Sequence, residues 1–244
     1  MPTPIENARL LLIQVRERED VEKQEQDCFV ERCRIRKDQL DAVNLLNDPV
    51  PTWDQAGAFD VVMIGGAGVL SVTQDHPFNE ALTELVLRLC EADRPLFGAC
   101  WGHQFVAQAL GGTVITDHDR REIGTNKVEL TPAGRADPIF AGLPPSFQAH
   151  MGHHDYASKL PAGAVELATS RQCPNQSFRI DGKMVYGMQF HCELNTARLL
   201  ERLTIYQHIY KPDDDYLENL KREPIPTPET DGLLRRFLEL ALPT

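Results

Sequence analysis

The sequence predicts an α/β protein in which helices flank one mostly parallel central sheet. Short apolar runs alternate along the chain with longer amphipathic stretches, the pattern of strands joined by crossover helices. Its 244 residues allow one large or two small domains. Because no repeat or low-complexity tract divides the chain, we expect a single domain over residues 1–244.

The first half supplies the strands of that sheet. Apolar runs at 10–15, 59–64 and 96–99 are predicted as strands, and the spacing of apolar residues at 81–90 and 103–110 predicts helices. The charged stretch 16–41 is interpreted as a helix or an ordered insertion, within an enlarged segment over 16–54.

Beyond residue 112 the strands become shorter. They are expected at 113–116, 127–130 and 165–168, and a small antiparallel hairpin is expected from 176–180 and 183–190, which flank the turn signal Asp181-Gly182. Residues 195–210 have helical spacing. A C-terminal extension over 211–244 is predicted to be a Pro- and Asp-rich surface segment followed by a final helix that Thr227 could cap.

Charge and composition restrict the class of partner. There are 25 Lys and Arg against 36 Asp and Glu, a net charge of −11, which disfavours non-specific binding to nucleic acid or to anionic lipid. The start lacks a basic and apolar leader, and no long apolar run is present. We expect a cytoplasmic protein with no membrane and no nucleic-acid partner, in which the six cysteines are thiols.

The sharpest chemical signal surrounds Cys100. A predicted strand runs into Gly98-Ala99-Cys100-Trp101-Gly102, where a helix follows at once, and this is the layout of a nucleophile elbow with Cys in place of Ser. Side chains at the two glycines would collide with the strand or the helix. A helix N-terminus also favours the thiolate form. A plain buried cysteine is the alternative.

A base and its orienting carboxylate occur further along. His191 and Glu193 are two residues apart at a predicted strand end, so in extended backbone both side chains point to the same face. Glu193 could then hold the His191 imidazole in the required tautomer. Alone, the pair could equally be a rim histidine beside a solvated carboxylate.

The glycine-rich residues 65–68 follow another predicted strand. A turn without side chains lets backbone N–H groups face a reacting carbonyl, so Gly66 and Trp101 are predicted to form an oxyanion hole. A phosphate-binding loop is the rival interpretation, but the Lys and Ser/Thr of that motif are lacking.

Residues 98–104 and 189–193 together resemble the class I glutamine amidotransferases. Residues 121–124, 137–144, 153–155 and 160–161 are similar to the subgroup around the glutaminase part of GMP synthetase. The resemblance implies a flavodoxin-like fold with Cys100 as nucleophile, His191 as base and acid, and Glu193 as its orienter. It further implies substrate contacts at Gln104, Gly68 and His153, and no cofactor.

The sequence departs from the family pattern at two places. Cys192 stands where Pro usually separates the triad His and Glu, and we expect its side chain to turn away from the site. Ala67 stands in the position of a frequent Pro. The 16–54 segment is longer than expected and could carry specificity for a substrate or partner.

A metal site was considered at the histidine cluster His150, His153 and His154. Neither a carboxylate nor a Cys lies at standard spacing from these histidines, so no metal is predicted.

Three functions follow from these patterns. The first is hydrolysis of the glutamine side-chain amide, with the ammonia passing to a synthase on a separate chain, since the sequence has no ATP pyrophosphatase loop. The second is a stand-alone γ-glutamyl hydrolase or peptidase acting on γ-glutamyl amines or peptides. The third is a non-catalytic binding module, which the intact Cys100, His191 and Glu193 disfavour.

Overall fold

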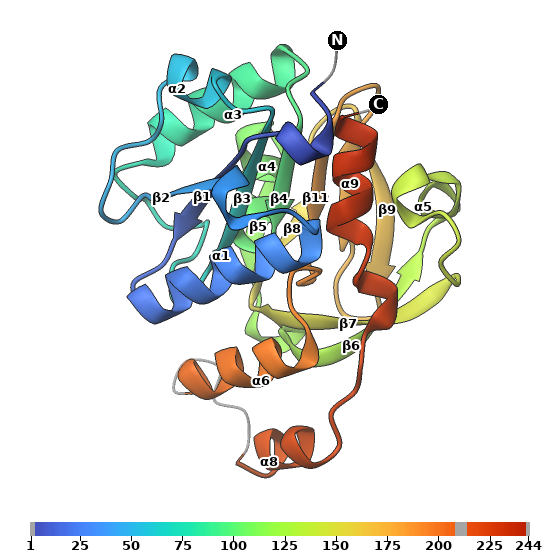
Figure 1. The fold of residues 1–244 in the computed structure, drawn as a ribbon. Coiled ribbons are helices and arrows are strands. Elements are labelled where there is room, and N and C mark those ends of the chain that lie inside the picture. The colour runs from blue at the N-terminus through green and yellow to red at the C-terminus, as the bar shows by residue number, and fades with distance from the viewer. Residues whose placement is uncertain (1–2, 208–213, 243–244) are drawn as a thin grey trace.

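Nine strands form one mixed sheet that organises the whole molecule (Figure 1). The structure is a computed structural model that describes residues 3–207 and 214–242. The strands are, in sheet order, β2 (Leu40–Asn44), β1 (Leu10–Val15), β3 (Val61–Ala67), β4 (Leu96–Ala99), β11 (Val185–Met188), β10 (Ser177–Ile180), β9 (Ala164–Ser170), β6 (Glu122–Leu130) and β7 (Ser146–His153). The five from β2 to β11 pair in parallel, and the rest pair antiparallel.

Two hydrophobic cores lie on opposite faces of the parallel half. Leu10 and Leu12 of β1 belong to one core and Leu11 and Ile13 to the other, because successive side chains of a strand point to opposite faces. The first core is covered by α1 (Glu19–Cys33) and α9 (Leu233–Ala241), and the second by α3 (Asn79–Glu91) and α4 (Trp101–Ala109). Figure 1 shows α1 and α9 on the near side of the sheet.

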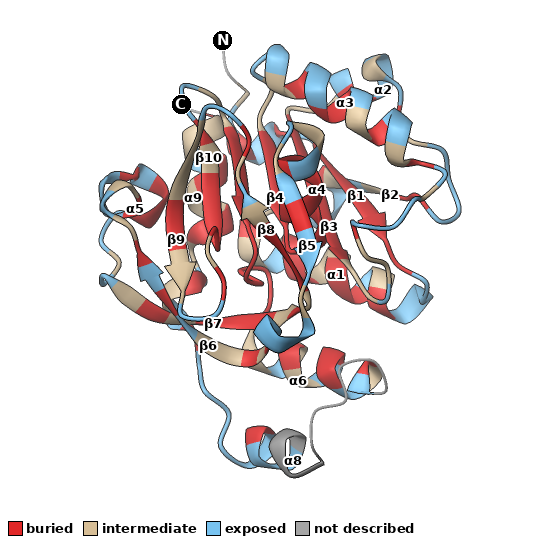
Figure 2. Cartoon of the chain, turned by 180° about the vertical axis from the view of Figure 1, so that it is seen from behind, coloured by how far each residue is buried: buried red, intermediate tan, exposed pale blue. Residues whose placement is uncertain are grey.

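The remaining elements lie around both halves of the sheet (Figure 2). β5 (Thr113–Thr116) and β8 (Asp155–Lys159) form a separate antiparallel pair beside α4. α2 (Trp53–Gly57) and α5 (Pro132–Ala136) are short. α6 (Thr196–Ile205) and α8 (Asp214–Arg222) contact each other.

The predicted fold class is confirmed as a single α/β domain with helices on both faces of a large sheet. Strands 10–15, 96–99 and 113–116 have the predicted bounds. The antiparallel part is larger than the small hairpin region expected, because β6, β7 and β9 extend the same sheet.

Several expectations need correction. The segment 16–41 is a helix followed by the start of edge strand β2, and 211–229 contains α8. Residues 208–210 of the predicted 195–210 helix lie outside the described residues, and α6 itself ends at Ile205. Thr227 precedes a 3-10 turn and its side chain caps no helix, whereas Gly232 is the N-cap residue of α9.

Candidate active site

Cys100 sits at a strained turn between β4 and α4. Its φ of 50° and ψ of −102° lie in a region that side chains rarely adopt. The turn is compact because a Cβ at Gly98 would lie 2.5 Å from the Gly102 carbonyl oxygen, and a Cβ at Gly102 would lie 2.2 Å from the Ile64 carbonyl oxygen. The predicted elbow and the steric reason for both glycines are therefore present.

The structure brings His191 and Glu193 together beside the thiol. The Glu193 carboxylate oxygen Oε1 lies 2.7 Å from Nδ1 of His191, and the Cys100 sulfur is one of the groups that raise the pKa of that ring. The predicted reason was incorrect, however. β11 ends at Met188, and His191 to Glu193 lie in a turn after the strand rather than in extended backbone.

The pKa values of His191 and Glu193 are shifted in opposite directions. Burial alone would lower the pKa of His191, but the Glu193 carboxylate and the Cys100 sulfur outweigh it and raise that pKa to about 10. Burial would raise the pKa of Glu193, yet the His191 ring and Arg202 lower it to about 2. At neutral pH these shifts favour the charged forms, so an imidazolium faces the Glu193 carboxylate.

Arg202 of α6 contacts the Glu193 carboxylate, and Gln24 of α1 in turn contacts Arg202. Arg202 of α6 donates from Nη1 to Glu193 Oε1 at 3.2 Å, and its Nε donates to Oε1 of Gln24 in α1 at 3.1 Å. Arg202 is 5% exposed, so its positive charge lies inside the protein beside the carboxylate. Sequence reasoning missed both residues, because only the packing of α1 against α6 brings them together.

Gly65, Gly66 and Ala67 are part of β3 and Gly68 follows it, so the predicted tight turn does not begin at Gly65. The N–H of Gly66 donates to Oε1 of the buried Glu25 carboxylate at 2.9 Å. Glu25 also pairs with the buried Arg16, and a Cβ at Gly66 would lie 2.8 Å from Nη2 of that arginine. Gly66 therefore could serve an oxyanion only after its N–H leaves Glu25.

Trp101, the other predicted oxyanion donor, is placed as expected. It is the first residue of α4, so its N–H has no acceptor within the helix and points from the helix N-terminus. Its ring is buried and stacks on Phe105 with ring centroids 4.9 Å apart.

A pocket of about 500 Å³ opens beside Cys100. The predicted substrate contacts Gln104, Gly68 and His153 all line it. However, Nε2 of Gln104 already donates to the Asp155 carbonyl oxygen at 2.6 Å and to Oε1 of Gln189 at 3.0 Å. Gln104 is thus part of the built pocket wall.

His153 is also engaged by the protein. Its Nδ1 lies 3.0 Å from the Asp155 carbonyl oxygen, and its Nε2 lies 3.3 Å from Oε2 of Glu122. Neither ring nitrogen is directed at the pocket. Polar residues also line the pocket that were not predicted as substrate contacts: Ser71, Thr73, Gln74, Thr116, His118, Arg121, His154 and Asp155.

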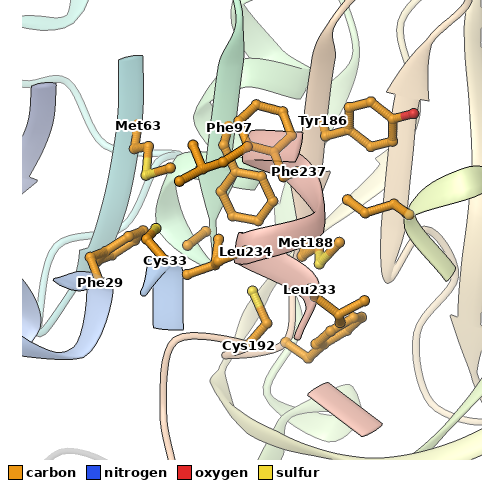
Figure 3. Close-up of a cluster of buried hydrophobic side chains, with 14 of the residues drawn as sticks. Phe29, Cys33, Met63, Phe97, Tyr186, Met188, Cys192, Leu233, Leu234 and Phe237 are labelled. Atoms are coloured by element: carbon orange, nitrogen blue, oxygen red, sulfur yellow. The ribbon is translucent and has the colours of Figure 1, made fainter. Parts of the chain in front are cut away.

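The other cysteine beside the triad faces away, as expected. Cys192 is fully buried in the hydrophobic core under α9, where Figure 3 shows it near Leu233. Burial raises the pKa of its thiol well above the ordinary value. Cys192 therefore behaves as a core residue.

The predicted histidine cluster is not a joint ligand set. His150 is buried with Nδ1 3.1 Å from the Thr125 hydroxyl, and burial together with His191 lowers its pKa to about 4. The His154 ring instead packs edge-on against His118, with ring centroids 5.2 Å apart.

Comparison with known proteins agrees with this geometry. The model of the family "Glutamine amidotransferase class-I" matches residues 28–204, well over half of the chain. The chain belongs to this family. The amidotransferase expected from the motifs around Cys100 and His191 is thereby confirmed at the level of the family.

Sequence relatives of this amidotransferase domain include GMP synthases named as glutamine-hydrolysing. That of Clostridium novyi is 35% identical over 117 residues, 48% of this chain and 22% of the relative. That of Thermosipho melanesiensis is 33% identical over 134 residues, 55% of this chain and 24% of the relative. The amidotransferase chain thus spans about a quarter or less of these relatives.

Solved structures show the same fold. A glutamine amidotransferase from Thermotoga maritima has a TM-score of 0.74 at 23% identity, covering 97% of this chain and 99% of that one. One from Methylobacillus flagellatus has a TM-score of 0.71 at 19% identity, covering 96% and 95%. No helix among the described residues is long and apolar enough to cross a membrane.

Proposed function

We propose that this amidotransferase hydrolyses the side-chain amide of glutamine through a Cys100-His191-Glu193 triad. The observation that carries the proposal is the 2.7 Å contact of Glu193 Oε1 with Nδ1 of His191, a ring whose pKa is also raised by Cys100, the strained residue at the N-terminus of α4. An adjacent pocket provides room for the substrate.

The charges suggest the order of steps. The Cys100 thiolate attacks the amide carbon, which forms a carbon–sulfur bond and a tetrahedral oxyanion. The N–H of Trp101, joined by Gly66 once Glu25 releases it, stabilises that oxyanion. His191 then gives its proton to the departing nitrogen, so ammonia leaves and a γ-glutamyl thioester remains.

Water completes the cycle. The neutral His191 accepts a proton from water as its oxygen adds to the thioester carbonyl. Collapse of this second tetrahedral intermediate releases glutamate and restores the thiolate beside an imidazolium. The net reaction consumes one glutamine and one water and yields glutamate and ammonia.

We assign the substrate contacts to the pocket that Gly68, Gln104 and His153 help to build. Asp155 and Arg121 line the same pocket and carry opposite charges, which suits the ammonium and carboxylate of an amino acid. Asp155 is fixed by Ser71 Oγ at 2.5 Å and Thr116 Oγ1 at 2.6 Å, so its carboxylate is preorganised.

The proposed use of the ammonia is by a synthase on a separate chain in the cytoplasm. The relatives named glutamine-hydrolysing GMP synthases are much longer than the part that matches. This supports an acceptor site outside the described domain.

Glutamate release by the purified protein tests the assignment. Replacing Cys100 with Ala should lower turnover at least about a thousandfold, because triad members act as a unit. Cys90→Ala in α3 is the matched control and should keep wild-type turnover. Retained turnover in Cys100→Ala would refute the proposed nucleophile.

A stand-alone γ-glutamyl hydrolase is the second candidate. The pocket lining also includes His118 and His154, so it continues beyond the groups assigned to the amino-acid end. Comparing kcat/KM for glutamine and for γ-glutamyl dipeptides separates the two. A preference for dipeptides by orders of magnitude would favour the hydrolase.

A further inference from the structure

Three buried side chains with metal-binding atoms converge under one wall of the pocket. The atoms of Glu122, His153 and Cys173 that could bind a metal all lie within 4.8 Å of one another. Glu122 and His153 are register partners in the β6–β7 pair, and Cys173 lies between β9 and β10. All three residues are buried.

The backbone fixes the orientation of the His153 ring. Nδ1 lies 3.0 Å from the Asp155 carbonyl oxygen, which can only accept a hydrogen bond, so Nδ1 carries the proton of the neutral ring. The lone pair of Nε2 then faces Oε2 of Glu122 at 3.3 Å, and Nε2 has no hydrogen-bond partner among the described residues. Two acceptors facing each other need a positive charge between them.

The distance between Nε2 of His153 and Oε2 of Glu122 matches that between two ligand atoms of one metal ion. Two ligand atoms bonded to one tetrahedral zinc at about 2.0 Å lie roughly 3.3 Å apart, the separation found between His153 and Glu122. Cys thiolate, imidazole and carboxylate are the ligand types that zinc takes. A doubly charged ion would also neutralise one thiolate and one carboxylate, which removes the cost of burying them.

Neighbouring groups hold two of the three ligand side chains in place. Gln176 donates from Nε2 to Oε2 of Glu122 at 2.5 Å, and the His153 Nδ1–H donates to the Asp155 carbonyl. A ligating histidine whose second nitrogen binds a carbonyl is typical of metal sites, since that contact fixes tautomer and ring. Gln176 is itself fully buried, so the carboxylate it contacts is held in place.

We propose that Glu122, His153 and Cys173 bind a divalent transition-metal ion of the zinc class. With three protein ligands, one coordination position remains for water. The ion would tie β6, β7 and the β9–β10 connection together behind the pocket. It would thereby fix His153 and the Asp155 backbone without taking part in amide hydrolysis.

Cobalt is the probe, because Co²⁺ bound to a thiolate gives a charge-transfer absorption in the near ultraviolet. The full-length protein is stripped with a chelator and titrated with Co²⁺ and then with Zn²⁺. We expect one equivalent of Co²⁺ to give the band and Zn²⁺ to displace it. Absence of a stoichiometric band in the wild-type protein would overturn the proposal, and a proton shared by His153 and Glu122 would then explain the contact.

Variants assign the ligands. Cys173→Ser should abolish the band, whereas Cys90→Ser and Cys100→Ser should keep it. Glu122→Gln should raise the Kd for Co²⁺ at least about tenfold. A band that survives in Cys173→Ser would place the metal at another thiol and refute the site. Because the wild-type titration needs no variant and no turnover, it is independent of the proposed glutaminase.

Discussion

Cys100 has a strained backbone, and its sulfur raises the pKa of His191. Its positive φ costs free energy that the β4–α4 packing must supply, and it directs the sulfur toward His191. Glu193 then raises the proton affinity of the ring from the other side. The imidazolium that results suits the protonation of a leaving nitrogen.

The Cys100 sulfur should contribute to the raised pKa of His191. Replacing Cys100 with Ser should lower the pKa of His191 from about 10 toward its ordinary value, since the electrostatic contribution of the sulfur is lost while that of Glu193 remains. NMR detection of the imidazole signals across pH measures the shift. Cys90→Ser should leave the titration unchanged, and an unaltered His191 in Cys100→Ser would show that the sulfur does not contact the ring.

The same residues predict a pH dependence of stability. The pKa of His191 is raised to about 10 in the folded state, so its contribution is complete below its ordinary value of 6.5 and is lost as pH rises toward 10. The pKa of Glu193 is lowered to about 2, so its contribution is complete above 4.5 and is lost as pH falls toward 2.

Urea denaturation of the wild type and of the His191→Gln/Glu193→Gln variant measures this effect. The difference in the free energy of unfolding should be largest between about pH 4.5 and 6.5 and should shrink on both sides. The groups facing the pair are Cys100, Arg202 and His150. A difference that grows steadily up to pH 10 would contradict the raised pKa.

Local spacing was sufficient to select Cys100, His191 and Glu193 as candidates, but it did not indicate the residues that contact them. The glycines on both sides of Cys100 indicated a nucleophile, and the two-residue separation of His191 and Glu193 indicated a base with its carboxylate. The backbone at His191 and Glu193 is nevertheless a turn and not a strand. Arg202 and Gln24 meet only because α6 packs against α1, and 178 positions separate them in the chain. No periodicity within one segment encodes such a contact.

At the level of elements, the buried carboxylate of Glu25 ties α1 to β1 and to β3. The Glu25 carboxylate accepts from Gln14 Nε2 at 2.8 Å, from Arg16 and from the Gly66 N–H at 2.9 Å. Burial opposes the charged form, but Arg16 keeps the pKa of Glu25 below its usual value. The segment 16–54 thereby reaches the strand beside the nucleophile.

Breaking this pair should be costly. Arg16→Met alone leaves a buried carboxylate without its cation, and we expect a loss of about 3–5 kcal/mol in the free energy of unfolding by urea denaturation. The double variant Arg16→Met/Glu25→Leu should recover much of that loss, because no uncompensated charge remains. Lys23→Ala, which breaks the exposed pair with Glu19 in the same helix, is the matched control and should change little. Equal stability of the single and double variants would mean that Glu25 is not charged.

Elements at the sheet edges were the hardest to predict. β2 is a short edge strand with an exposed Asp41, so its pattern is weak. In β7, the apolar Phe147, Ala149 and Met151 alternate with Gln148 and His150, which is the pattern of a strand. The histidines of this segment suggested a metal site instead, so no strand was predicted there. For the same reason Glu122 and Cys173 could not be linked to His153, because antiparallel register, not sequence spacing, brings them together.

At the scale of the whole molecule, the C-terminal helix is part of the main core. α9 carries Leu233, Leu234, Phe237 and Leu238 into the cluster that also holds β1, β3 and β4 (Figure 3). Figure 1 shows α9 lying across the strands beside α1, so the last helix covers a sheet face that begins at residue 10. Through α9, the described residues 233–242 close the same hydrophobic core to which β1 contributes.

Phe237 tests that closure. Its ring is fully buried, with ring centroids 5.2 Å from Phe97 in β4 and 5.9 Å from Tyr186 in β11. Phe237→Ala should lower the free energy of unfolding by about 3–5 kcal/mol, the cost of the lost burial and the remaining cavity. Unfolding followed by tryptophan fluorescence and by circular dichroism should show one coincident transition at lower urea. The exposed Glu239→Ala on the same helix should shift the midpoint little. An early separate transition that leaves the rest of the chain folded would instead show that α9 is an independent addition.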